Sequence, residues 1–211
     1  VSVGLTGVPD GPIPGSPDTT GSGKEGLLFP ATYQIDEKKE RDTLDILRRM
    51  ADTTETRYED ALAEDGRADV IEELGLTDYE VLVVASLIEE EARTQADRPK
   101  ISRVIYNRLV SEWSLGIDAT ACYAAQKPCS DLTQEDLDSD SPWNTRNPLN
   151  RGLPPTPIAA PGEASIRAAL APEDGPWMYY VLTEEDGSHT FATTDEEFQA
   201  AKRICVERGF C

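Results

Sequence analysis

The sequence is poor in histidine, in basic residues and in long apolar runs. It contains one histidine, His189, and 20 lysines and arginines against 40 aspartates and glutamates, which gives a formal net charge of −20. Nucleic acids and anionic membrane surfaces would repel such a charge, so neither is expected as a partner. A neutral or zwitterionic polymer such as a glycan is not excluded, and solubility is the simplest explanation for the acidic residues.

No apolar run approaches the roughly 20 residues that a membrane-spanning helix requires. The longest run is Val81–Ile88, which is too short and is flanked by acids. The first residues lack the basic region and the apolar stretch of a secretory signal peptide. We therefore interpret the chain as a mature or trimmed fragment.

The four cysteines form two close pairs, without the CxxC spacing or the histidines of a metal site. Cys122 and Cys129 enclose a short polar loop, and Cys205 and Cys211 lie at the C-terminal end. Four cysteines allow three pairings; proximity favours 122–129 and 205–211, and four unpaired thiols are the alternative. Local disulfides would indicate an oxidising, extracytoplasmic location.

The pattern of apolar, capping and turn residues predicts an α+β fold. Residues 1–23 are rich in Gly, Pro, Ser and Thr and are expected to form an extended arm or linker, which leaves 24–211 as the folded domain. The stretch 116–163 is irregular and long enough to be functional. The expected elements are a strand at 26–35 interrupted at Pro30, helices at 43–64, 68–74, 77–94, from 97, at 163–170 and 196–207 (capped by Asp195), and a hairpin from 177–182 and 188–192. The fold is thus expected to have a helical core, a small antiparallel hairpin and long cleft-forming loops.

Three consecutive glutamates, Glu89, Glu90 and Glu91, lie near the end of the expected helix 77–94. On a 3.6-residue period Glu91 lies over Leu87 and Ile88, whereas the other two point away from this apolar stripe or to its margin. A carboxyl among apolar neighbours is harder to ionise, which raises its pKa. A raised pKa is what a general acid needs near neutral pH, so Glu91 is the candidate catalytic residue.

Other interpretations of Glu91 stay open on pattern alone. An equally favoured interpretation is that Glu91 forms a structural salt bridge with Arg103 or Arg108 of the next helix. A two-carboxylate glycosidase would need a second acid. The candidates for that acid are Asp118, Asp138 and Asp140. Ser-His-Asp catalysis is less favoured, because His189 is not accompanied by a Gly-x-Ser-x-Gly elbow.

Eight short segments then occur in a familiar order. They are Glu25–Tyr33, Ala85–Glu91, Ile105–Leu109, Leu115–Asp118, Ser141–Thr145, Gly152–Ile158, Ala160–Gly162 and His189–Phe191. Together they resemble the endolytic murein transglycosylases, also called the YceG-like family, over nearly the whole chain after the arm. Ala31 and Pro155-Thr156 depart from the family pattern, and the cysteines are not a general family feature.

The resemblance implies an enzyme that cleaves the MurNAc–GlcNAc β-1,4 bond of nascent peptidoglycan and leaves a 1,6-anhydro-MurNAc end, which terminates strand growth. The second glutamate of the Glu-x-Glu pair, Glu91 here, would act as acid and then as base, without metal or cofactor. One carboxyl suffices because the 6-hydroxyl of the sugar replaces water. The alternative from another class is a catalytically silent wall-binding or scaffold module.

The resemblance also implies substrate contacts and partners. The candidate contacts are Glu89, Asn107, Asp118, Ser141, Asn144 and His189, and for each of them turn capping or loop bracing is the alternative. Bracing is favoured for Thr145, and a core position for Trp143. The partners would be glycan strands and peptidoglycan synthases at the outer face of the bacterial cytoplasmic membrane. The family's membrane anchor and LysM-like region are not recognisable in this sequence.

Overall fold

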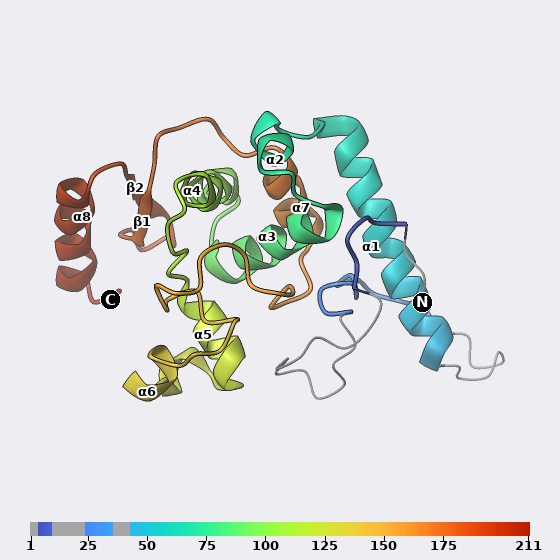
Figure 1. Cartoon of the computed structure of the whole chain (residues 1–211), viewed down its shortest axis with the longest axis horizontal. Coiled ribbons are helices and arrows are strands. Elements are labelled where there is room, and N and C mark those ends of the chain that lie inside the picture. The colour runs from blue at the N-terminus through green and yellow to red at the C-terminus, as the bar shows by residue number, and fades with distance from the viewer. Residues whose placement is uncertain (1–3, 10–23, 36–42) are drawn as a thin grey trace.

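The computed structural model describes residues 4–9, 24–35 and 43–211, which form an assembly of helices with one two-stranded antiparallel sheet (Figure 1). The predicted α+β class is therefore confirmed. None of the helices in these ranges is long and apolar enough to cross a membrane. The elements are α1 (Thr43–Asp65), α2 (Asp69–Leu74), α3 (Asp78–Glu91), α4 (Arg98–Val110), α5 (Asp118–Ala125), the 3-10 helix η1 (Cys129–Asp131), α6 (Gln134–Leu137), α7 (Glu163–Leu170), β1 (Tyr179–Leu182), β2 (His189–Ala192) and α8 (Asp195–Glu207).

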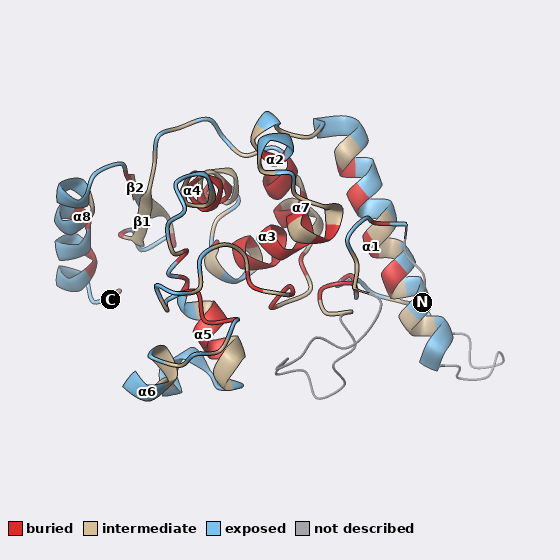
Figure 2. Cartoon of the chain, viewed as in Figure 1, coloured by how far each residue is buried: buried red, intermediate tan, exposed pale blue. Residues whose placement is uncertain are grey.

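Helix α3 lies at the centre of the fold and packs against α7, α4 and α5 (Figure 1). Every residue from Val81 to Ile88 is buried, so α3 is covered on all sides. A helix that is apolar all round needs such cover to be stable. The outer helix α1 instead buries one stripe, with Ala51, Thr54, Tyr58 and Ala61 at spacings of three and four residues (Figure 2).

The predicted start of α3 is confirmed. The Thr77 hydroxyl accepts a hydrogen bond from the Glu80 backbone N–H, and the Glu80 carboxylate accepts one from the Thr77 N–H at 2.8 Å, which forms a capping box. The helix ends at Glu91, three residues before the predicted end at Thr94, because the backbone of Ala92 turns to an extended conformation. The last residue of this buried helix is therefore an acid.

The strand predicted at 26–35 is wrong. Leu27 and Phe29 are buried in alternation, as the strand pattern requires, but their backbone groups bond to helix α1. Phe29 N–H donates to the Met50 carbonyl, and Leu27 C=O accepts from the Thr54 hydroxyl at 2.8 Å. The segment is therefore an extended chain that lies along helix α1, and no strand of the described residues pairs with it.

The loop predicted at 116–163 is less irregular than expected, because it contains α5, η1 and α6. Helix α6 starts with a capping box in which Asp136 replaces the usual glutamate and Thr133 is the N-cap. Helix α8 also starts one residue earlier than predicted. Thr194, not Asp195, is its N-cap, since the Thr194 hydroxyl accepts from the N–H of the third helical residue.

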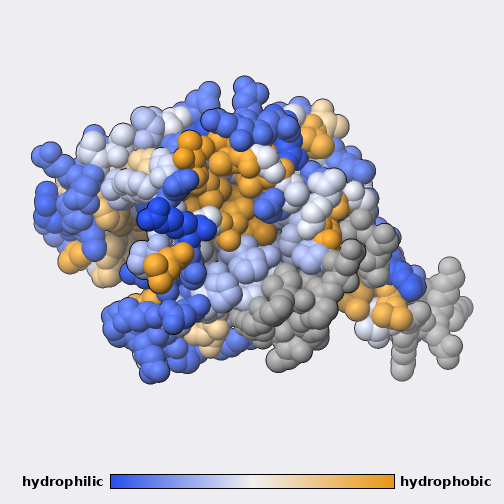
Figure 3. Space-filling model, in the orientation of Figure 1, coloured by the Kyte–Doolittle hydropathy of each residue, from blue (hydrophilic) through white to orange (hydrophobic). Residues whose placement is uncertain are grey.

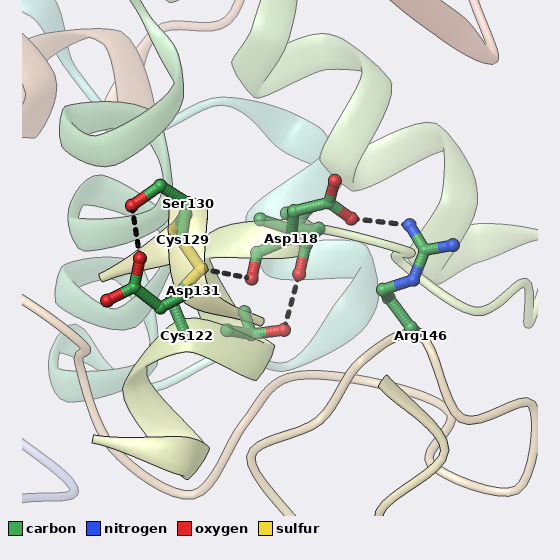
Figure 4. Close-up of a disulfide and its surroundings, with 8 residues drawn as sticks. Asp118, Cys122, Cys129, Ser130, Asp131 and Arg146 are labelled. Carbon is green, nitrogen blue, oxygen red and sulfur yellow. Dashed lines mark hydrogen bonds and ion pairs between the residues drawn. A yellow bond between two sulfur atoms is a disulfide. The ribbon is translucent and has the colours of Figure 1, made fainter. Parts of the chain in front are cut away.

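The two disulfides pair as proximity predicted. Cys122–Cys129 joins α5 to η1 (Figure 4), and Cys205–Cys211 joins the last turn of α8 to the C-terminal residue. Each of them closes a short local loop.

Asp78, the first residue of α3, joins four parts of the chain. One carboxylate oxygen accepts from Thr6 N–H at 3.0 Å and from the Thr6 hydroxyl at 2.7 Å. The other accepts from the Tyr58 hydroxyl at 2.9 Å and from Arg67 at 2.8 Å. Burial alone would raise the pKa of Asp78, but these hydrogen bonds outweigh it and lower that pKa.

Part of the predicted arm therefore packs on the helices. Residues 4–9 include the buried Leu5 and contact α1 and α3, whereas residues 1–3 and 10–23 lie outside the described residues. The division of the chain at residue 23 stays a prediction.

The visible surface is mostly hydrophilic, as the net charge predicts (Figure 3). The most extended apolar area of this face lies at its centre, over α2, α3 and α4. A hollow of about 350 Å³ there is lined mainly by Leu74, Leu76, Val83, Leu109 and Leu153.

We expect Asp78→Asn to destabilise the fold by about 2 kcal/mol, because it removes the partly buried anionic partner of Arg67 and leaves that arginine with the exposed Glu72 as its counter-charge. Urea unfolding at pH 7 measures the effect, with the exposed Asp60→Asn of α1 as control. Since the pKa of Asp78 is lowered in the folded state, the difference should shrink as the pH falls below the ordinary range of aspartate pKa values. Equal midpoints for the two variants would contradict this role.

Candidate active site

Glu91 lies at the C-terminal end of α3, where the buried helix meets the β-hairpin. It is partly buried, and the helical turn beneath it consists of the fully buried Leu87 and Ile88. Its Oε2 accepts a hydrogen bond of 3.0 Å from the Tyr180 hydroxyl of β1. The Glu91 carboxyl thus lies on an apolar stripe and accepts a hydrogen bond from one tyrosine.

Burial raises the pKa of Glu91 to about 7, which confirms the shift that helical phase predicted. The Tyr180 hydrogen bond opposes the shift because it favours the ionised carboxylate. The negative charges of Asp118 and Glu90 raise the pKa further, and the positive charge of Arg108 lowers it. The C-terminal end of a helix also carries partial negative charge, which disfavours an anion there.

The salt-bridge alternative for Glu91 is not what the structure shows. In the described part of the chain, no ion pair within 4.0 Å joins Glu91 to an arginine. Arg103 pairs with Asp174 at 2.8 Å. Arg108 donates to the Met178 carbonyl at 2.7 Å, so that it braces the approach to β1 and acts on Glu91 only through its charge.

Asp118 is the one candidate second acid whose charge acts on Glu91. It begins α5, is exposed, and forms an ion pair with Arg146 (Figure 4). Asp138 accepts from the Gln134 side chain at 2.9 Å and Asp140 from the Asn147 side chain at 3.3 Å, and neither is among the main causes of the Glu91 shift. Of the three predicted candidates, Asp118 is the one with a clear electrostatic effect on Glu91.

Ser141 and Asn144 hold the loop that contains them. The Asn144 side chain is fully buried and donates to the carbonyls of Leu137 and Ser139 at 2.9 and 3.0 Å. The Ser141 carbonyl accepts from the Asn150 side chain at 2.7 Å. The Ser141 hydroxyl accepts from the Trp143 N–H at 3.4 Å, so both predicted contacts brace this loop.

Asn107 and Trp143 also belong to the scaffold. Asn107 donates to the carbonyls of Gly175 and Trp177 at 3.0 and 2.8 Å, which holds the segment that leads into β1. Trp143 is fully buried and donates to the Thr156 hydroxyl at 2.8 Å, which confirms the predicted core position.

Glu89 joins α3 to α7. Its Oε2 accepts from the Ser165 hydroxyl at 2.6 Å and from the Gly162 N–H at 3.2 Å, and Arg98 lies 3.7 Å away. Gly162 is the N-cap of α7, so Glu89 places its negative charge at a helix N-terminus. The structure separates Glu89 from Glu91, as helical phase requires.

His189 supports Tyr180. Its backbone N–H and its ring Nδ1 lie 2.8 and 2.9 Å from the same oxygen of Asp97, and only 7% of either side chain is exposed. The ring of His189 meets that of Tyr180 edge-on at 5.6 Å. His189, a predicted substrate contact, is thus packed behind the tyrosine that contacts Glu91.

The sequence analysis did not predict two residues of the cluster around Glu91 and His189. Tyr180 lies 89 residues from Glu91, and Asp97 lies 92 residues from His189. Asp97 was expected only at the start of a helix, yet its side chain does not cap α4 and binds the hairpin instead. The hairpin pattern predicts alternating faces for Tyr179 and Tyr180 but not which helix they meet.

Comparisons with known proteins identify the family. The model of the YceG-like family matches residues 7–204. An endolytic murein transglycosylase of Bacillus subtilis strain 168 is 38% identical over 178 residues, which are 84% of this chain and 47% of that protein. One of Streptococcus pneumoniae serotype 2 strain D39 is 29% identical over 180 residues, which are 82% of this chain and 30% of that protein.

A solved structure shares the fold. The crystal structure of a YceG-like protein from Listeria monocytogenes matches with a TM-score of 0.72 and 34% identity, over 85% of this chain and 55% of that one. The chain spans about half the length of its Bacillus relative and less of its Streptococcus relative. Because the family model matches nearly the whole sequence, the chain belongs to the YceG-like family.

Proposed function

We propose that this chain is the catalytic part of an endolytic peptidoglycan lytic transglycosylase and that Glu91 is its acid and base. The observation that carries the proposal is a single glutamate at the end of a buried helix, with a pKa of about 7 and a hydrogen bond from Tyr180. The relatives named endolytic murein transglycosylase support the substrate class. Strand cleavage by this activity would terminate glycan elongation.

The proposed reaction needs one carboxyl. Protonated Glu91 gives its proton to the oxygen that links MurNAc C1 to GlcNAc, the C1–O bond breaks, and GlcNAc leaves with a free hydroxyl. The 6-hydroxyl oxygen of the same MurNAc bonds to C1 and closes the 1,6-anhydro ring. The Glu91 carboxylate takes the proton of that hydroxyl, so no water is consumed and the enzyme returns to its starting state.

Tyr180 and Asp118 each favour one of the two protonation states of Glu91. Burial, together with the nearby Glu91 charge, raises the pKa of Tyr180 well above its ordinary value, so its phenol stays a donor throughout. It holds the carboxylate that forms after the first proton transfer. The negative charge of Asp118 favours the protonated Glu91 that the first transfer requires.

The remaining predicted contacts take a different role in this proposal. Asp118 is the one that we propose to face substrate. Glu89, Asn107, Ser141, Asn144 and His189 act indirectly, since their polar groups hold α7, the hairpin and the loops in place.

We also propose that the protein works at the outer face of the bacterial cytoplasmic membrane, beside peptidoglycan synthases, in a longer protein that carries a membrane anchor. The two disulfides suit an oxidising compartment.

Glu91→Gln should abolish the formation of anhydro ends. Glutamine keeps the shape of the side chain and an acceptor for Tyr180 but cannot transfer a proton, so the rate should fall roughly 10²- to 10⁴-fold. Muropeptide analysis of digested peptidoglycan measures the ends, with the exposed Glu59→Gln as control. New reducing ends formed by the unmodified protein would instead indicate a hydrolase. Binding of the unmodified protein to peptidoglycan without new ends would indicate a wall-binding module.

The pH profile of kcat/KM should fall above about pH 7, as Glu91 loses its proton. Asp118→Asn removes a charge that raises the pKa of Glu91, so the fall should move to lower pH. Tyr180→Phe removes a bond that lowers this pKa, so the fall should move to higher pH. Asp138→Asn is the control. Shifts in the same direction for both variants would refute this account of the site.

Glu91→Gln should also stabilise the fold in alkaline solution. The pKa of Glu91 is about 7 in the folded protein against an ordinary 4.5. At about 1.36 kcal/mol per pKa unit, the ionised carboxylate lowers the free energy of unfolding by up to about 3 kcal/mol above pH 7. This cost grows between pH 4.5 and pH 7. It is absent below pH 4.5, where Glu91 is protonated in both the folded and the unfolded protein. Thermal unfolding at pH 4 and pH 8 tests this; a gain of the same size at both values would contradict it.

A further inference from the structure

A second hollow lies beside Glu90, the residue before Glu91. Its volume is about 440 Å³, within the roughly 300–1,000 Å³ typical of ligand sites. One wall is the Cys122–Cys129 disulfide. The rest of the lining includes Glu90 of α3, Tyr123 of α5, Gln126 and Lys127 of the loop after α5, and Ile158.

The walls of this pocket are fastened to the scaffold. Ile158 N–H donates to the buried Ser86 hydroxyl of α3 at 3.1 Å. Across the pocket, the loop after α5 is closed by the disulfide and by the ion pair of Lys127 with Asp136 at 2.8 Å. The pocket thus exists before any ligand enters, which lowers the ordering cost of binding.

Helices α3 and α5 contribute residues both to this pocket and to the surroundings of Glu91. Glu90 and Glu91 are consecutive on α3, so their side chains point about 100° apart and the pocket lies next to the carboxyl rather than at it. On α5, Asp118 and Cys122 are one turn apart and on one face. Figure 4 shows the disulfide beside the Asp118–Arg146 ion pair.

The chemistry of the lining suits a neutral sugar. The lining contains one acid, Glu90, and one base, Lys127, whose charge Asp136 already balances at 2.8 Å, so no unbalanced basic group is present to select an anion. The carboxylate, amide and phenol groups match hydroxyl and acetamido groups. Ala119, Ile158 and the ring of Tyr123 offer apolar surface to the faces of a pyranose. In a strand of alternating GlcNAc and MurNAc, both neighbours of the cleaved MurNAc are such sugars.

We propose that this pocket binds the GlcNAc next to the cleaved MurNAc and that the Cys122–Cys129 disulfide is a positioning element that holds its wall. The inference rests on the proposed function. It assigns a role to a disulfide that the family resemblance did not predict.

The second disulfide provides a matched control. The two bridges span 7 and 6 residues, so their removal relaxes the unfolded chain to a similar extent. With peptide-free glycan strands, the double variant Cys122→Ser/Cys129→Ser should raise KM roughly tenfold, equivalent to about 1.4 kcal/mol of binding, with kcat within about twofold. Cys205→Ser/Cys211→Ser should change neither.

A binding measurement separates this inference from the proposed reaction. On the Glu91→Gln background, calorimetric titration with a peptide-free GlcNAc–MurNAc oligosaccharide should show roughly tenfold weaker binding without the 122–129 bridge. Gln126→Gly should also weaken binding while keeping the fold, because Gln126 has a positive φ of 54° that glycine adopts freely.

Each outcome has one meaning. Equal Kd and KM values for the two disulfide variants, or a loss of kcat alone, would overturn the pocket assignment. Absence of anhydro ends from the unmodified protein would refute the proposed reaction and leave the binding comparison valid.

Discussion

The burial of α3 on all sides is the constraint on which the structure depends. Its eight consecutive buried residues, Val81–Ile88, need cover from α7, α4 and α5, and this cover brings distant parts of the chain to the helix. Glu91 lies at the end of the same helix, over the fully buried Leu87 and Ile88. The raised pKa of Glu91 therefore follows from the packing that stabilises the fold.

The two ends of α3 show how position decides the behaviour of an acid. Asp78 lies at the N-terminus, where the helix dipole favours an anion, and it accepts hydrogen bonds from Thr6, Tyr58 and Arg67. Its pKa is lowered. Glu91 lies at the C-terminus with one hydrogen bond and acidic neighbours, and its pKa is raised to about 7. One acid anchors the fold, and the other keeps its proton up to near-neutral pH.

Most polar residues around the site are committed to internal hydrogen bonds. Asn144 holds its loop, Asn107 holds the entry to β1, and Glu89 joins α3 to α7. Asp97 and His189 pack behind Tyr180. These bonds hold the surroundings of Glu91 in one geometry, so that the site is organised without a ligand, as electrostatic preorganisation requires.

The helices with strong periodicity or caps, the local disulfides and the apolar phase of Glu91 could be predicted from the sequence, because each depends on residues a few positions apart. The sequence also carried the family resemblance. Tertiary packing, by contrast, places residues 26–35 along α1, brings the Tyr180 hydroxyl to Glu91 and brings Asp97 to His189. These contacts join residues up to 92 positions apart, and the packing around α3 selects them, which no local pattern encodes.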